Sequence, residues 1–274
     1  MSLPKALVSA LVRMWPFANG SGRFLDRFAS GLELGSLRTT CTTTDGFEMT
    51  VLPDDLVGRH LILSGRFDRS PIEKLLSHAR DGDVIADIGA NIGYVSCLSL
   101  SNVQGSRVIA VEPNPIVLEL LRANLAQFPA DRYEIREVAL SDHAGPASFE
   151  ASSENLGGGS LSSTGTIQVQ LMEAAKLFAS FEKLDLIKID VEGHEEPIFR
   201  SIEAELVRLK PRAILFEEQL GKAGPDGPIG SILNRCGYKV FGVNKKLFST
   251  SLVPIRSAAE CRFNDYLALP DDSC

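Results

Sequence analysis

The hydrophobic and polar positions along the chain follow an alternating pattern from about residue 84 onwards. Short, nearly continuous apolar segments alternate there with segments whose apolar residues recur at helical spacing. The apolar segments predict strands at residues 84–88, 107–111, 133–140, 184–189, 213–216, 238–243 and 262–267. The helical spacing predicts helices at residues 94–100, 116–125, 195–209 and 228–236. This alternation indicates an α/β fold with a mostly parallel sheet and helices on both faces.

The first 70 residues follow a different pattern. Apolar side chains recur at helical spacing in residues 3–17, with Lys5 and Arg13 between them, and predict an amphipathic helix. This helix either packs on the domain or on a dimer partner, or it contacts a membrane surface. Asp45-Gly46 separates two strand-like segments and predicts a β-hairpin, and a further helix is expected at residues 71–80. We therefore expect an N-terminal helical arm and hairpin at 1–70 and a main domain at 71–274.

One segment interrupts the alternation. Residues 151–166 are almost entirely Ser, Gly and Thr, with three consecutive glycines at 157–159. Such a composition predicts a loop. It is either a mobile surface loop or a lid over a substrate, because long loops in compact domains are often functional.

Composition narrows the class of protein. The 274 residues are 44% hydrophobic and 23% charged, which is typical of a globular protein with a substantial core. No apolar run reaches the roughly 18 residues that a spanning helix needs, and residues 3–17 lack the features of a signal peptide. The net charge of −7 argues against a large nucleic-acid-binding surface. The five cysteines include no C-x-x-C pair, so we expect neither a disulfide framework nor a zinc site, and a cytoplasmic location.

The most informative segment follows the first strand of the alternating region. Asp87 ends this strand, and Gly89, Asn91 and Gly93 form a turn before the next helix. In an open α/β sheet the ligand lies at the carboxyl ends of the strands, and glycine lets the backbone approach it closely. We expect the carboxylate of Asp87 to face this ligand. The second strand ends in Glu112, whose carboxylate suits the hydroxyl groups of a ribose.

Two classes of nucleoside ligand compete for this turn. A dinucleotide requires the fingerprint G-x-G-x-x-G, but Asn91 stands where its second glycine belongs. The carboxylate of Asp87, at the end of the strand, would also repel the pyrophosphate of a dinucleotide. S-adenosylmethionine carries no phosphate, and its ammonium and sulfonium groups are positive. The pattern D-x-G-x-x-x-G therefore favours the methyl donor.

The motifs together resemble those of the FkbM-type methyltransferases. The first is Asp87-Ile-Gly-Ala-Asn-Ile-Gly93, and the second is Glu112-Pro-Asn-Pro115. The third is Ile187-Lys-Ile-Asp-Val-Glu-Gly-His-Glu195. The resemblance covers roughly residues 45–245. The chain departs from the family at His194, where a small residue is frequent.

The resemblance implies a Rossmann-like class I methyltransferase with a seven-stranded sheet whose last strand is antiparallel. It also implies S-adenosylmethionine as the methyl donor and O-methylation of a sugar or polyketide hydroxyl. In such a fold, Ala139 and Asp142 at the end of the third strand would lie near the adenine. Asp142 is either an adenine contact or only part of a turn.

Methyl transfer to a hydroxyl also needs a group that accepts the proton. Asp190 and His194 follow the fourth strand, and Glu217 closes the fifth, so these three are the catalytic candidates. Asp190 is also a candidate donor contact. His194 has a suitable intrinsic pKa for a base; alternatively, it is a helix N-terminal residue without a chemical role. The acidic residues suit a magnesium ion only weakly, so we predict no metal.

Other activities stay open at this point. An N-methyltransferase or a nucleic-acid methyltransferase has the same fold, although the turn after the fourth strand lacks the [D/N]-P-P-[Y/F] motif common in base amino methylation. An NAD(P)-binding oxidoreductase and a non-catalytic donor-binding protein are alternatives of other classes. We expect a small-molecule acceptor, no nucleic acid, no stable membrane insertion and a possible homodimer through the N-terminal arm.

Overall fold

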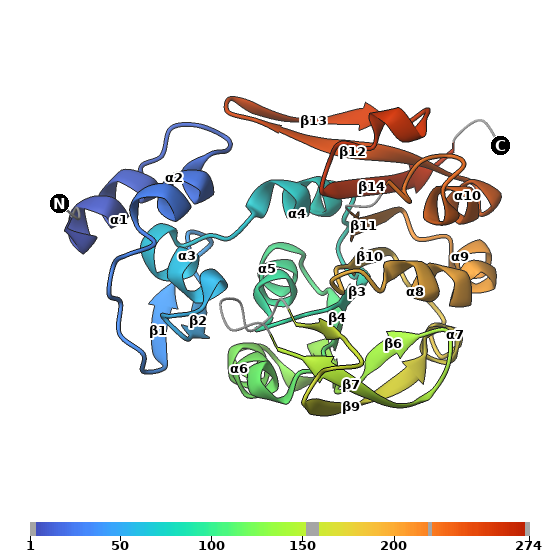
Figure 1. The fold of residues 1–274 in the computed structure, drawn as a ribbon, viewed down its shortest axis with the longest axis horizontal. Coiled ribbons are helices and arrows are strands. Elements are labelled where there is room, and N and C mark those ends of the chain that lie inside the picture. Colours follow the sequence, from blue (N-terminus) through green and yellow to red (C-terminus); the bar gives the residue numbers. More distant parts are fainter. Residues whose placement is uncertain (1–3, 152–158, 219–220, 272–274) are drawn as a thin grey trace.

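A twisted eight-stranded sheet forms the centre of the computed structural model, which describes residues 4–151, 159–218 and 221–271 (Figure 1). Its strand order is β13-β12-β14-β11-β10-β3-β4-β5. The five parallel strands are β3 (Val84–Ile88), β4 (Arg107–Val111), β5 (Tyr133–Arg136), β10 (Leu186–Ile189) and β11 (Ala213–Glu217). The chain builds outward from β3 to β5 on one side and continues with β10 on the other. This reversal of strand order creates a crevice at the carboxyl ends of β3 and β10.

The expected number of seven strands in this sheet is wrong. The last strand, β14 (Asp265–Pro270), is antiparallel to its neighbours β11 and β12 (Tyr238–Lys246), as expected. The eighth strand is β13 (Ser249–Pro254), which folds back on β12 after Leu247 and Phe248. Because β13 lies at the edge of the sheet, its successive side chains differ little in burial. Its sequence therefore shows only a weak hydrophobic pattern.

The predicted strand 133–140 is divided between two sheets. β5 ends at Arg136, and β6 (Ala139–Ser141) belongs to a separate four-stranded sheet of order β6-β9-β7-β8. The other strands of this sheet are β7 (Gly145–Glu150), β8 (Ser160–Leu161) and β9 (Ile167–Glu173). An apolar run predicts burial but not the sheet that buries it. Within the predicted loop 151–166, residues 160–161 form β8, and residues 152–158 lie outside the described residues.

Helices cover both faces of the main sheet. α4 (Arg69–Leu76), α5 (Tyr94–Asn102) and α6 (Pro115–Leu125) pack on the face that carries Ile85 and Val108. α7 (Ala174–Ala179), α8 (Glu195–Ser201), α9 (Glu203–Leu209) and α10 (Pro228–Arg235) pack on the opposite face, with Ala86 and Ile109. Successive strand residues alternate between the two cores, as the pleat requires. The predicted helix 195–209 is two helices, which separate at Ile202.

The N-terminal region forms a lobe beside the main sheet (Figure 1). It contains α1 (Lys5–Arg13), α2 (Ser21–Phe28), the hairpin strands β1 (Thr39–Thr42) and β2 (Glu48–Val51), and α3 (Leu56–Ser64). The antiparallel pairing of β1 with β2 confirms the hairpin predicted at Asp45-Gly46. Met49 and Val51 join the core beneath α5 and α6. In the described part of the chain, no helix has the length and apolar character needed to cross a membrane.

Candidate functional site

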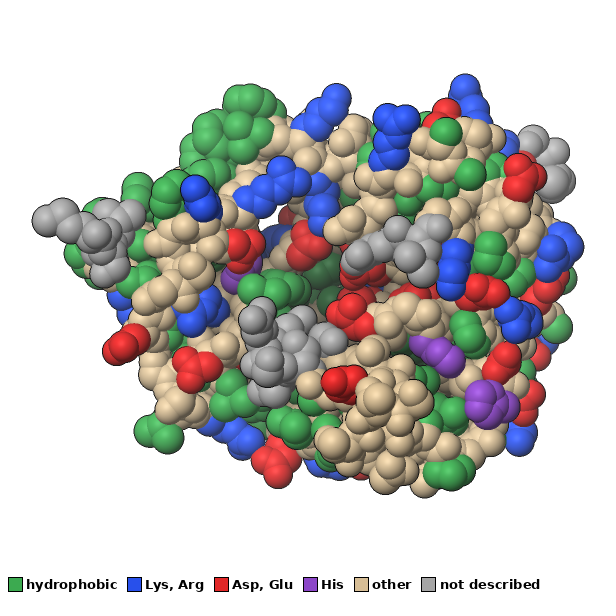
Figure 2. All heavy atoms as spheres, in the orientation of Figure 1, with side chains coloured by type: hydrophobic (Ala, Val, Ile, Leu, Met, Phe, Trp, Pro, Cys, Tyr) green, Lys and Arg blue, Asp and Glu red, His purple; other side chains and the backbone are tan. Residues whose placement is uncertain are grey.

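A cavity of about 740 Å³ lies where the N-terminal lobe meets the carboxyl ends of β3, β10 and β11. The glycine turn lines its floor through Gly89 and Asn91, and Asp190 and Glu217 line it at the ends of β10 and β11. Residues of the loop between α3 and α4, Arg66 among them, complete the wall. Figure 2 shows the cavity as a hollow rimmed by acidic and basic side chains. Its volume lies in the range of small-molecule sites.

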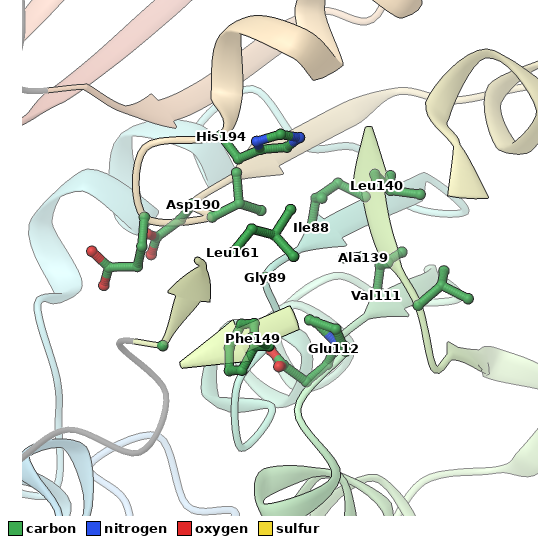
Figure 3. A pocket seen from close by; sticks show the side chains of 15 residues that line it. Ile88, Gly89, Val111, Glu112, Ala139, Leu140, Phe149, Leu161, Asp190 and His194 are labelled. Carbon is green, nitrogen blue, oxygen red and sulfur yellow. The ribbon is translucent and has the colours of Figure 1, made fainter. Parts of the chain in front are cut away.

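A second, narrower cavity continues from the first across the end of β4 (Figure 3). It is lined by Glu112 and Ala139, and by Phe149 and Leu161 from the four-stranded sheet. Gly89, Asp190 and Glu192 line both cavities. The two therefore form one crevice, which the glycine turn and the loop after β10 share.

Unusual backbone conformations are concentrated at this crevice. In the described residues, four non-glycine residues have a positive φ, and Asp68 (27°), Asn91 (52°) and Glu192 (54°) all line the large cavity. Such conformations are unfavourable for residues with a Cβ and gather at functional sites. The fourth, Lys210, ends α9 away from the crevice.

The glycine turn is held in place by its neighbours on both sides. Gly89 has φ of +76°, and a Cβ added there would lie 1.8 Å from the carbonyl oxygen of Asp190. The backbone N–H groups of Gly89 and Ala90 donate to the carbonyl of Val111 at 2.9 and 3.0 Å. A glycine at position 89 thus brings the loops after β3, β4 and β10 together.

The carboxyl group of Glu112 is buried at the end of β4. Its two oxygens accept hydrogen bonds from the backbone N–H groups of Asn91 (2.8 Å) and Asn114 (2.9 Å). Burial raises the pKa of Glu112 to about 7, although both hydrogen bonds oppose this shift. The predicted ribose-binding residue is therefore joined to the glycine turn and titrates near neutral pH.

A buried lysine, Lys188, connects the predicted site residues beneath the turn. Its ammonium group donates to the carbonyl of Gly89 at 2.6 Å and lies 3.4 Å from the carboxylates of Asp87 and Asp190. Burial alone would lower the pKa of Lys188, but these carboxylates outweigh it and raise the pKa. Asp87 is fully buried, accepts a hydrogen bond from Ser96 and lines neither cavity. Its carboxylate thus supports the turn from below instead of facing a ligand.

The catalytic candidates occupy different parts of the crevice. Asp190 lines both cavities, Glu217 lines only the large one and His194 only the narrow one. Nε2 of His194 lies 3.0 Å from Oγ of Ser141, and burial lowers the pKa of the ring, which is therefore neutral at pH 7. Among the described residues, no group of three or more His, Cys, Asp or Glu side chains is arranged to hold a metal ion.

The two predicted adenine contacts are separated. Ala139 lines the narrow cavity, whereas Asp142 lines neither cavity. The carboxylate of Asp142 lies 2.8 Å from Nδ1 of His143 and 3.6 Å from Arg200. The hydrogen bond from His143 lowers the pKa of Asp142.

Three site residues were missed by the sequence-based prediction. Lys188 is the single charged residue in an otherwise apolar strand, and this exception could have identified it. Glu192 belongs to the third motif of the resemblance but was not among the predicted site residues, yet it lines both cavities, and burial raises its pKa. Arg66 lies in a loop of no recognisable motif, so no signal in the sequence marked it.

The sequence of the chain is similar to those of known methyltransferases. The model of the FkbM methyltransferase domain matches residues 87–240. Hexuronic acid methyltransferase AglP of Haloferax volcanii is 31% identical over 140 residues, which are 50% of this chain and 57% of that protein. The match therefore spans little more than half of the relative's length.

Solved methyltransferase structures also align with the chain. Methyltransferase FkbM from Methylobacillus flagellatus KT is 14% identical with a TM-score of 0.46, over 70% of this chain and 44% of that chain. Precorrin-6y C5,15-methyltransferase from Geobacter metallireducens GS-15 is 18% identical with a TM-score of 0.43, over 76% and 91%. Because the family model matches more than half of the residues and includes the glycine turn, Glu112 and the loop after β10, this chain belongs to the FkbM methyltransferase family.

Proposed function

We propose that this protein transfers a methyl group from S-adenosylmethionine to a hydroxyl group of a small molecule. The acceptor that we propose in particular is a sugar. One observation carries the proposal: a narrow cavity lined by Glu112 opens, past Gly89 and Asp190, into a large polar cavity. The narrow part suits a nucleoside and the large part suits a polar acceptor. A sugar is supported by the hexuronic acid named for the relative AglP.

The residues of the narrow cavity fit the nucleoside part of the donor. Glu112 would accept hydrogen bonds from the ribose hydroxyls, and Ala139 and Leu140 would contact the adenine ring. The carbonyl groups of the turn and the carboxylate of Asp190 suit the positive charges of the rest of the molecule. When bound, S-adenosylmethionine supplies an electrophilic methyl carbon on its sulfonium.

Asp190 is the group in this proposal that takes the hydroxyl proton. It lines both cavities, and Lys188 fixes its carboxylate where they meet. The acceptor oxygen forms a bond to the methyl carbon as the carbon–sulfur bond breaks with its electron pair on sulfur, and the proton passes to the carboxylate of Asp190. Glu217 lies on the acceptor side and would orient the acceptor.

The first test is calorimetric titration with S-adenosylhomocysteine, with NAD and NADP as controls. Micromolar binding of S-adenosylhomocysteine alone is expected. Binding of a dinucleotide instead, or of none of the three, would overturn the assignment of the donor.

The second test follows transfer of a labelled methyl group to hexoses, hexuronic acids and polyketide alcohols. Asp190→Asn should lower kcat about 100-fold or more, the usual contribution of a positioned base. His194→Gln should retain kcat within a few-fold, because its ring lies in the narrow cavity against Ser141. Loss of activity in His194→Gln but not in Asp190→Asn would assign the base to the histidine.

A further inference from the structure

Most cationic side chains that line the large cavity are already neutralised by a carboxylate. The Arg69 guanidinium forms a two-bond pair with Asp45, at 2.8 Å for each bond, and its Nε lies 2.7 Å from Glu73. Lys245 pairs with Asp68 and Asp265, at 2.9 and 2.8 Å. The ammonium group of Lys188 is shared by the carboxylates of Asp87 and Asp190.

Arg66 differs from these cations. Within the described residues it forms no ion pair, and its Nη2 is buried without a hydrogen-bond partner. The backbone around it is fixed, because Oγ of the buried Ser64 donates to the carbonyl of Arg66 at 2.7 Å. A buried charged donor without an acceptor is unfavourable and rare in native proteins. The guanidinium is therefore suited to an anion that enters the cavity.

The position of Arg66 indicates which anion this is. Arg66 lines the large cavity together with Tyr94, the first residue of α5, directly after the glycine turn. Glu112 binds the other end of the same turn, through the N–H of Asn91. A ligand whose ribose lies at Glu112 and which extends along the turn reaches the N-terminus of α5, where negative charge is favoured.

We propose that Arg66 binds the carboxylate of the methionyl part of the methyl donor. The inference rests on the proposed donor and adds a residue at the opposite end from Glu112. A guanidinium presents parallel N–H groups that match the two oxygens of a carboxylate. Arg66 thus belongs to the donor site, although it lies outside residues 87–240, which the family model matches.

The test compares two ligands in calorimetry without any acceptor. S-adenosylhomocysteine carries the carboxylate, whereas S-adenosyl-3-thiopropylamine keeps the amine but lacks the carboxylate. Arg66→Gln should weaken S-adenosylhomocysteine binding by about 10-fold to 100-fold, the range of a charge-assisted pair, and leave the second ligand unchanged. The unaltered protein should prefer S-adenosylhomocysteine by a similar factor. Arg66→Lys should recover part of the loss, since it keeps the charge but not the planar fork.

Arg23→Gln is the matched control. Arg23 also lines the large cavity and forms no ion pair in the described part of the chain, but it is exposed. Its substitution should change neither affinity. Circular dichroism and unfolding of each variant show whether Arg66→Gln is folded, and the comparison of ligands in the unaltered protein needs no variant.

Three results would overturn the inference. Equal weakening of both ligands would indicate a general disturbance of the cavity. Unchanged binding of both, with a raised KM for hexuronic acids alone, would assign Arg66 to the acceptor. Equal affinity of the unaltered protein for both ligands would show that no group recognises the carboxylate. If neither ligand binds the unaltered protein, the proposed function itself fails, which is a distinct outcome.

Discussion

At the scale of single residues, Glu112 shows how burial sets the ionisation of the site. Its folded pKa of about 7 lies above its usual value of 4.5, so below pH 7 most of the free protein carries a neutral carboxyl group there. Ribose hydroxyls donate to the ionised form. The affinity for S-adenosylhomocysteine should therefore rise with pH between about 5.5 and 7, by up to about tenfold per unit, and level off above.

Glu112→Gln is the control for this pH dependence. Calorimetry across the pH range should find weaker binding that no longer changes with pH. The free energy of unfolding depends on pH in the opposite direction from the affinity. Because the native state holds this proton more tightly than the unfolded chain, the protein becomes less stable as pH rises from 4.5 to 7. The variant should lack that decline. A wild-type affinity that is flat from pH 5.5 to 8 would contradict the assignment of Glu112 to the ribose.

Lys188 is the second residue whose environment makes a strong prediction. Replacing it with methionine keeps most of its volume but leaves Asp87 and Asp190 without their cation. Breaking a buried pair in this way typically lowers the free energy of unfolding by about 3–5 kcal/mol. Urea unfolding measures the change, and donor affinity should fall with it because the Gly89 carbonyl loses its donor.

Lys183→Met is the matched control for Lys188→Met. Lys183 also lies near two aspartates, Asp83 and Asp185, but its side chain is 55% exposed. Exposed pairs contribute about 0–1 kcal/mol. Similar losses of unfolding free energy in the two variants would show that Lys188 stabilises the fold no more than a surface lysine does.

At the scale of elements, the loops after β3 and β10 depend on each other through Gly89. In Gly89→Ala, the new methyl group would meet the Asp190 carbonyl in addition to the unfavourable φ of +76°. We expect a loss of about 2–5 kcal/mol in unfolding free energy and a large loss of donor affinity.

Gly82→Ala separates the two causes in Gly89→Ala. Gly82 has nearly the same φ, +77°, but nothing lies within 4 Å of an added Cβ. Its substitution should therefore show only the conformational effect, about 1–2 kcal/mol. If both glycine variants lose the same stability, the close approach to Asp190 has no energetic importance.

The secondary structure was predictable from the sequence to different degrees along the chain. β3, β4 and the β1–β2 hairpin match the expected segments because strong apolar runs and an Asp-Gly turn mark them locally. The boundary between β5 and β6, and the break at Ile202, depend on which neighbours bury each segment. β9 also has a local strand pattern, because its apolar residues alternate with glutamines, but it was not among the predicted strands.

At the scale of the whole molecule, Asn19 connects the N-terminal lobe to the far edge of the main sheet. Its side-chain amide donates to the carbonyl of Lys246 at 2.8 Å and to Thr250 at 2.9 Å, and its carbonyl accepts from Ser70 at 2.6 Å. The rings of Trp15, Phe17 and Phe248 pack edge to face beside it. These contacts close one side of the large cavity, which Asn19 and Leu247 line.

Asn19→Ala should loosen this closure. Hydrogen exchange is expected to become faster in α1 and α2, with a loss of about 1–3 kcal/mol for the two part-buried hydrogen bonds, to Thr250 and from Ser70. The KM for the acceptor should rise while S-adenosylhomocysteine binding changes little. Asn234→Ala, at an exposed position on α10, provides the comparison and should change neither quantity. Unaltered exchange in Asn19→Ala would show that the lobe is held elsewhere.

The α/β class, the glycine turn, the acidic residue at the end of β4 and the family resemblance can all be read from the amino-acid sequence. These features are local, since a strand, a turn and a strand-terminal carboxylate each occupy a few consecutive residues. Only the folded chain shows that Asp87 lies beneath the turn and that Asp142 lies outside the crevice. It also brought Lys188 and Arg66 to the site. Burial and the pairing of charges depend on segments far apart in the chain, so no local pattern records them.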